Sequence, residues 1–118
     1  MLMPWLLVFV TVSMFARPAT RLKIQPGYAR AFNNRGAAYQ KKHQYERAMQ
    51  DFEQSIKIDP KYAGAFANRA QVYQNMGQYD RAVRDYDEAI RLQPDLESVW
   101  NGRCWAGGLA YSQLILLI

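Results

Sequence analysis

The stretch NNRGAAYQKKHQYERAMQDF, residues 33–52, decides the fold because it returns as ANRAQVYQNMGQYDRAVRDY at residues 67–86. When residues 27–60 are aligned with residues 61–94 without a gap, 15 of the 34 positions are identical. A third copy begins at residues 99–104 and then fades. The chain is therefore built by repetition, and stacked repeats of this length present their function on an extended surface.

Each repeated unit is expected to form two helices. In the first unit, Phe32, Gly36 and Tyr39 recur at helical spacing, and a second series contains Ala48 and Phe52. The pattern predicts an all-α fold of antiparallel helix pairs, with helices over 29–42, 45–58, 63–76 and 79–92. The aromatic side chains that we expect to be buried between the helices are Tyr39, Phe52, Tyr73 and Tyr86.

Turn signals separate these helices. His43 and Gly77 occupy the same place in the two units, and both residue types tolerate left-handed backbone better than most. Asp59 and Gln93 each precede a proline, which disfavours helical backbone in the residue before it. Each second helix should therefore end just before the proline that closes its unit.

Composition excludes several kinds of site. The 118-residue chain contains one cysteine, Cys104, and one histidine, His43, so neither an internal disulfide nor a Cys/His metal site is plausible. A catalytic nucleophile needs a base within hydrogen-bond reach, and the only histidine is assigned to a turn. The acidic residues of the second helices lie among arginines at helical spacing, which is typical of a solvated outer face. We therefore expect no enzymatic activity and no cofactor.

The net charge of +5 is unevenly distributed. Residues 1–42 contain seven basic residues and no acidic residue, whereas the rest of the chain contains eight basic and ten acidic residues. The basic excess lies beside an apolar N-terminus, which favours a membrane-surface effect over a nucleic-acid footprint. We expect no nucleic-acid partner.

A 34-residue unit of two helices in this register resembles the tetratricopeptide repeat. The family pattern W-x2-L-G-x2-Y…A-x3-F…P falls in the first unit on Phe32, Arg35, Gly36, Tyr39, Ala48, Phe52 and Pro60. In the second unit it falls on Phe66, Arg69, Ala70, Tyr73, Ala82, Tyr86 and Pro94. The resemblance covers about residues 19–106 and implies a short α-solenoid. It divides the chain into 1–18 (apolar N-terminal segment), 19–26 (tail of a partial repeat), 27–60 and 61–94 (two full repeats) and 95–118 (partial third repeat with an apolar C-terminus).

One departure from the family pattern has a structural interpretation. The usual leucine is arginine in all three copies, at Arg35, Arg69 and Arg103. Folding each hairpin about its turn places Arg35 opposite Asp51, and the equivalent pair is Arg69 with Asp85. We interpret both as structural ion pairs within a repeat, and prefer this to a role in ligand binding.

The resemblance also implies a function, that of a protein-interaction scaffold or adaptor. In similar arrays the first helices line a concave groove that holds an extended peptide or a partner helix. The groove positions carried over to this chain are Arg30, Asn33, Asn34, Ala37, Gln40, Lys41, Gly64, Asn68, Gln71, Gln74 and Asn75. Asn34 and Asn68 are one repeat apart and are expected side by side. Amides and two cations favour an extended ligand with acidic groups.

A carboxylate clamp of the kind used by some co-chaperones of this family is not expected. That clamp uses Lys and Asn in the first unit, Asn in the second, and Lys and Arg in the third. The matching positions here are Arg30, Asn34, Asn68, Ser98 and Gly102. The two cations of the third unit are missing, which argues against binding of a chaperone tail in this manner.

Both ends of the chain are apolar. The segment MLMPWLLVFVTVSMFA, residues 1–16, has three interpretations that the sequence leaves open: a signal peptide, a membrane anchor and a cap that packs on the repeats. The anchor would hold the repeats on the cytoplasmic side, and we expect a cytoplasmic chain, tethered if the segment is an anchor. At the other end, a helix should begin near Glu97 and either run on or break at Gly107–Gly108.

Two full repeats are fewer than the roughly three usually needed for stability. Self-association through the apolar ends is one way to cover the open faces. Two alternatives to an independent binding module also stay open: a structural piece or fragment of a longer solenoid without a ligand of its own, and a membrane-tethered assembly factor.

Overall fold

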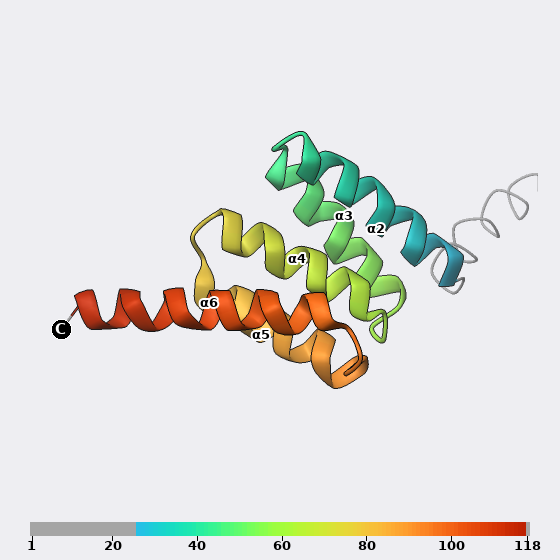
Figure 1. Ribbon diagram of the computed structural model, residues 1–118. Coiled ribbons are helices and arrows are strands. Elements are labelled where there is room, and N and C mark those ends of the chain that lie inside the picture. Colours follow the sequence, from blue (N-terminus) through green and yellow to red (C-terminus); the bar gives the residue numbers. More distant parts are fainter. Residues whose placement is uncertain (1–25, 118) are drawn as a thin grey trace, which may run out of the picture.

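The computed structural model describes residues 26–117, which form five helices and no strand. The helices are α2 (Pro26–Lys41), α3 (Tyr45–Ile58), α4 (Ala63–Asn75), α5 (Tyr79–Leu92) and α6 (Glu97–Leu116). The pairs α2–α3 and α4–α5 are antiparallel hairpins stacked side by side, and α6 packs on the second pair (Figure 1). The predicted all-α solenoid is confirmed, with small shifts at three helix ends. The largest is that α2 begins at Pro26, a residue type favoured at a first helical position.

The two hairpin turns share one geometry. His43 and Gly77 have positive φ angles of 57° and 77°, as their places in the repeat predict. In each turn, the residue after the left-handed position donates its backbone N–H to the carbonyl oxygen five residues earlier. Gln44 donates to Tyr39 at 3.0 Å, and Gln78 donates to Tyr73 at 2.8 Å. This arrangement closes the end of a helix around a left-handed residue. The turns therefore end the first helix of each repeat in the same way.

The core lies between the helices of each pair and continues from one pair to the next. Phe52 is fully buried with Ala48 and with Val72 of the following repeat. Tyr86 is 5% exposed and belongs to a second cluster that reaches α6. The expected burial is thus confirmed for Phe52 and Tyr86.

Tyr39 and Tyr73, which were also expected to be buried, are only half-buried. The guanidinium groups of Arg47 and Arg81 lie over their rings from outside, with Cζ 5.7 and 5.8 Å from the ring centroids. Arg35 and Arg69 also lie near these two rings, at 6.0 and 5.9 Å, so each half-buried tyrosine contacts two arginines.

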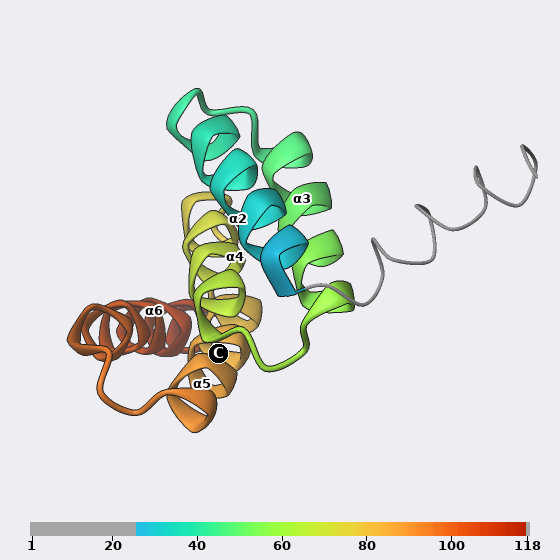
Figure 2. The same cartoon turned by 90° about the vertical axis from the view of Figure 1, so that its right-hand side faces the viewer.

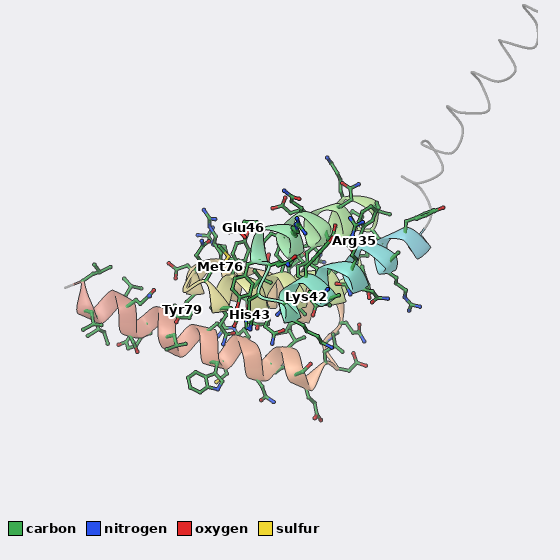
Figure 3. The ribbon with its side chains drawn as sticks, turned by 90° about the horizontal axis from the view of Figure 1, so that it is seen from above. Arg35, Lys42, His43, Glu46, Met76 and Tyr79 are labelled. Carbon is green, nitrogen blue, oxygen red and sulfur yellow. The ribbon has the colours of Figure 1, made fainter. Side chains whose placement is uncertain are left out.

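The helix α6 runs through Gly107–Gly108 without a break, which settles one of the alternatives left by the sequence. Its last turns extend past the turn between α4 and α5 (Figures 1 and 3). One side of α6 packs on the repeats through Val99 and Ala106, which are buried. The other sides remain open.

The predicted localisation, cytoplasmic with a tether to a membrane, requires correction. Within residues 26–117, each helix is too short or too polar to cross a bilayer. The segment 1–16, to which the anchor, signal-peptide and cap interpretations refer, lies outside the described residues.

Candidate functional site

The first helices of the repeats share one side of the molecule. Helix α4 contacts both α2 and α6, while α3 and α5 lie on the outside of the stack (Figure 2). A cavity of about 230 Å³ opens between α4, α5 and α6. Its lining residues are Ala67, Asn68, Gln71, Gln74, Asn75, Tyr86, Ser98, Val99 and Gly102.

Four of the groove residues expected from the sequence are brought together by this cavity: Asn68, Gln71, Gln74 and Asn75. They occupy successive turns of α4, so a single helix face presents four amide side chains. The structure does not bring Arg30, Asn34 or Lys41 into the cavity, and it leaves all three exposed on α2. The cavity is therefore an amide-lined site in the second repeat, and the cations lie apart from it.

Tyr86 forms part of the cavity wall and was missed as a site residue by sequence reasoning. A Cβ atom on Gly102 would lie 2.6 Å from Cζ of Tyr86, so only glycine lets the ring reach this position between α5 and α6. The hydroxyl of Tyr86 donates to Oε1 of Gln74 at 3.1 Å. Burial raises the pKa of this phenol. A signal was available, because a glycine inside a helix usually has a packing reason.

Amide side chains link the first repeat to the second. Nδ2 of Asn68 donates to Oδ1 of Asn33 at 2.9 Å, and Nδ2 of Asn33 donates to the hydroxyl of Tyr62 at 3.3 Å. A second bridge runs from Nε2 of Gln40 to Oε1 of Gln71, at 2.9 Å. These groups hold α2 against α4 before any ligand is bound.

The side-by-side pair expected at Asn34 and Asn68 is formed by a different residue. Asn68 meets Asn33, which is 6% exposed, whereas Asn34 is exposed. The reason is the stacking of the repeats. The face of α2 that packs on α4 contains Asn33, the residue directly before the Asn34 that the motif register indicated. Of the two remaining groove residues, Ala37 is half-buried, and a Cβ on Gly64 would lie 3.2 Å from the Tyr62 ring.

The two arginine–aspartate pairs expected from the alignment are present as two-point contacts. Arg35 donates from Nε and Nη2 to Asp51, both at 2.8 Å. Arg69 donates from the same atoms to Asp85 at 2.7 and 2.9 Å. Both carboxylates are buried, and the hydrogen bonds to them raise the pKa of each arginine.

The third arginine of the series behaves differently. Nε of Arg103 donates to Oδ1 of Asp87 on the preceding helix, at 2.9 Å. The side chain of its partner Asp87 is 53% exposed, whereas Asp51 and Asp85 are 6% and 10% exposed. The first two arginines therefore join the helices of one repeat, whereas Arg103 joins α6 to α5.

The raised pKa of Tyr86 predicts a loss of stability at alkaline pH. In the unfolded chain this phenol should titrate near pH 10, the ordinary value for tyrosine, and in the folded chain it titrates higher. Folding therefore favours the neutral phenol. Its contribution to the free energy of unfolding is complete below about pH 10 and disappears as the pH rises through the pKa of the folded state.

Tyr86→Phe should remove this part of the alkaline loss of stability, measured by urea unfolding at about pH 8 and about pH 11. Tyr111→Phe, on an exposed part of α6, controls for loss of a hydroxyl. An equal alkaline decline in the wild-type and Tyr86→Phe proteins would contradict the prediction.

Comparisons with known proteins agree with this architecture. The model of the tetratricopeptide repeat family matches residues 29–62 and 63–96, each match beginning two residues later than the unit boundaries chosen from the prolines. Among curated proteins, no sequence matches this chain significantly.

Several solved structures of tetratricopeptide domains are similar to this chain. The second such domain of Spaghetti (RPAP3), bound to the HSP90 peptide SRMEEVD, is 28% identical with a TM-score of 0.70, over 80% of this chain and 85% of that one. The second domain of human RPAP3, in complex with the HSP70 peptide SGPTIEEVD, is 29% identical with a TM-score of 0.64, over 67% and 66%. The first domain of Spaghetti, bound to SRMEEVD, has a TM-score of 0.72 at 20% identity, over 75% and 71%, and shows the fold alone.

The family model covers more than half of the chain, and the helices, their turns and their stacking follow the same pattern. The chain therefore belongs to the tetratricopeptide repeat family.

Proposed function

We propose that this chain is a protein-interaction module that binds an extended peptide on the face formed by α2, α4 and α6. The observation that carries the proposal is the cavity of about 230 Å³, which four of the expected groove amides line together with Ser98 and Gly102. A concave site with several convergent polar groups is the usual place for a ligand.

The chemistry of the cavity suits the backbone of a peptide. An amide side chain offers both a donor and an acceptor, so Asn68, Gln71 and Asn75 can pair with peptide groups without selecting a side chain. Gln74 is oriented by the hydroxyl of Tyr86, which leaves its Nε2 group as a donor toward the ligand. Binding should therefore depend mainly on hydrogen bonds to the peptide backbone and less on the side chains of the peptide.

Cations outside the cavity add a preference for acidic ligands. Arg30 and Lys41 are exposed on α2, the first helix of the first repeat. Exposed charges attract an acidic segment at long range and are screened within roughly 10 Å at 0.1 M salt. The affinity should accordingly fall as salt is raised.

The similar domains of known structure make acidic peptides the natural first probes, because both of the peptides bound there end in EEVD. Two of the five clamp positions are occupied here by Ser98 and Gly102, which carry no charge. A terminal carboxylate would therefore lack its cationic partners on α6. We expect SRMEEVD to bind weakly and an amidated SRMEEVD to bind nearly as well.

The test is fluorescence anisotropy with labelled SRMEEVD and the full chain. Asn68→Ala combined with Asn75→Ala, both in the cavity wall, should weaken binding by about tenfold, which corresponds to about 1.4 kcal/mol. Raising the salt from about 50 mM to about 500 mM should weaken it further. Glu88→Ala is the matched control, because Glu88 lies on the outer helix α5 and bonds Arg91 of the same helix.

The opposite pattern would refute the proposed face. If binding survives the change of Asn68 and Asn75 but is lost when Asp87 and Glu88 are changed, the ligand lies on the outer helices. If no acidic peptide binds the wild-type chain at millimolar concentration, the alternative of a structural element without its own ligand is favoured. Circular dichroism of each variant shows whether the helices are retained.

A further inference from the structure

Helix α6 carries most of the exposed apolar surface in the described part of the chain. Of the nine large hydrophobic side chains that are exposed there, seven belong to α6 and to Leu117 directly after it. Trp105 is 67% exposed, Tyr111 68%, and Leu116 85%. A patch of this kind marks an interaction surface more often than scattered apolar residues do.

The apolar residues of α6 are distributed around the whole helix. Only one side, with Val99 and Ala106, is covered by the repeats. Residues 104–117 contain no charged side chain. A helix that is apolar on all sides is normally buried on all sides, and α6 is not.

A shallow hollow of about 760 Å³ lies along one open side of this helix. Within the described part of the chain, its lining residues belong to α6: Asn101, Cys104, Trp105, Gly108, Leu109 and Ser112. Asn101, Trp105, Gly108 and Ser112 follow one another at intervals of four, three and four residues, and Ile115 continues the series. This is the spacing of a seam between two paired helices. We call these five residues the α6 seam.

Large and small side chains follow one another along the α6 seam. Trp105 is large and exposed, whereas Gly108 and Ser112 are small, and a Cβ on Gly108 would meet no atom within 4 Å. Large side chains pack well against small ones when two helices run antiparallel and close together.

We propose that the α6 seam pairs with the α6 seam of a second copy of this chain, antiparallel, about a twofold axis near Gly108. In this arrangement Trp105 of each copy lies over Gly108 and Ser112 of the other. A twofold axis uses the same patch on both copies, so one seam is sufficient to form a closed dimer.

Two features favour a second copy over other occupants. The seam carries no charge, so two copies meet without burying like charges. Large Trp105 alternates along the seam with small Gly108 and Ser112, so the bulky side chain of one copy can fill the space beside the small residues of the other. The apolar segment 1–16 of the same chain is the less favoured occupant. Helix α2, which follows that segment in the sequence, begins at the end of the molecule opposite to the free end of α6 (Figure 1).

The first experiment measures the mass of the full chain by analytical ultracentrifugation between about 1 and 100 µM. We expect twice the 13.7 kDa of one chain at the upper end of this range. Trp105→Asp should restore the mass of one chain, because it places two carboxylates at the seam. Tyr28→Asp is the matched control, since Tyr28 is 38% exposed on α2, away from the seam. A wild-type monomer at the highest concentration, or a dimer that survives Trp105→Asp, would overturn the proposal.

The second experiment tests the direction of pairing with disulfides. Near the axis, two residues at position 108 lie within the roughly 4–7 Å between Cα atoms that a disulfide requires. Two copies of Cys104, the exposed native cysteine, would be about 12 Å apart along the helices. Under mild oxidation, Gly108→Cys with Cys104→Ser should cross-link and the native chain should not. Cross-linking of the native chain in preference to the variant would indicate parallel pairing and overturn the antiparallel arrangement.

Discussion

Replacing Phe52 with alanine should lower the free energy of unfolding by about 3–5 kcal/mol, the usual cost of removing a fully buried phenylalanine. Phe52 has no exposed surface and joins α3 to α2 and α4, so its loss opens a cavity where three helices meet. Because natural domains are stable by only about 5–15 kcal/mol in total, much of the stability of this short array depends on one ring. Urea unfolding followed by circular dichroism measures the change through the midpoint and slope. Phe52→Leu, which keeps more of the volume, should cost clearly less.

The same ring explains why Gly36 is glycine, and this gives the prediction a second test. A Cβ on Gly36 would lie 2.7 Å from Cε1 of Phe52 and 3.2 Å from the carbonyl oxygen of Ala48. Gly36→Ala should therefore destabilise the wild-type chain by overpacking, despite the better helix propensity of alanine. In the Phe52→Ala background the ring is absent, and Gly36→Ala should be tolerated better. If the two substitutions change the free energy of unfolding additively, the contact between position 36 and the ring of Phe52 is not the reason that residue 36 is glycine.

Removing Asp85 should destabilise the chain more than removing Asp85 and Arg69 together. The side chain of Arg69 is 20% exposed and that of Asp85 is 10% exposed, so Asp85→Ala leaves a largely buried cation without its carboxylate. Breaking a buried pair from one side costs about 3–5 kcal/mol, and partial exposure should bring the loss here to about 2–4 kcal/mol. The double variant Asp85→Ala with Arg69→Ala removes both charges and should recover part of this loss.

Urea unfolding of the wild-type chain, the two single variants and the double variant forms a complete cycle for this pair. Glu88→Ala is the matched control, because Glu88 pairs with Arg91 on the exposed side of α5 and surface pairs contribute little. If Asp85→Ala costs no more than the double variant, the charge on Arg69 is not harmful when unpaired. The pairing of Arg69 with Asp85 would then contribute nothing measurable to the stability of the repeat.

Much of the candidate site followed from the repeat alone. The motif register placed Asn68, Gln71, Gln74 and Asn75 on one face of a first helix, and they do line one cavity. It missed Tyr86 and Val99, because their roles depend on how α6 lies against α5. The register also chose Asn34 instead of Asn33 as the neighbour of Asn68, since it carries no information about the angle between consecutive repeats.

The sequence by itself determined the helices, their turns and the pairing within each repeat. These follow from local periodicity, from His43 and Gly77 at left-handed positions, and from two hairpins that bring residues 16 apart together, as in the Arg35–Asp51 pair. Only the tertiary structure decided which amides meet between repeats, that Gly102 admits the ring of Tyr86, and that α6 leaves most of its apolar surface open. The physical reason is that contacts within a hairpin depend on spacing along one chain segment. Contacts between repeats depend on the rotation of one rigid helix pair against the next, and packing at buried side chains sets that rotation.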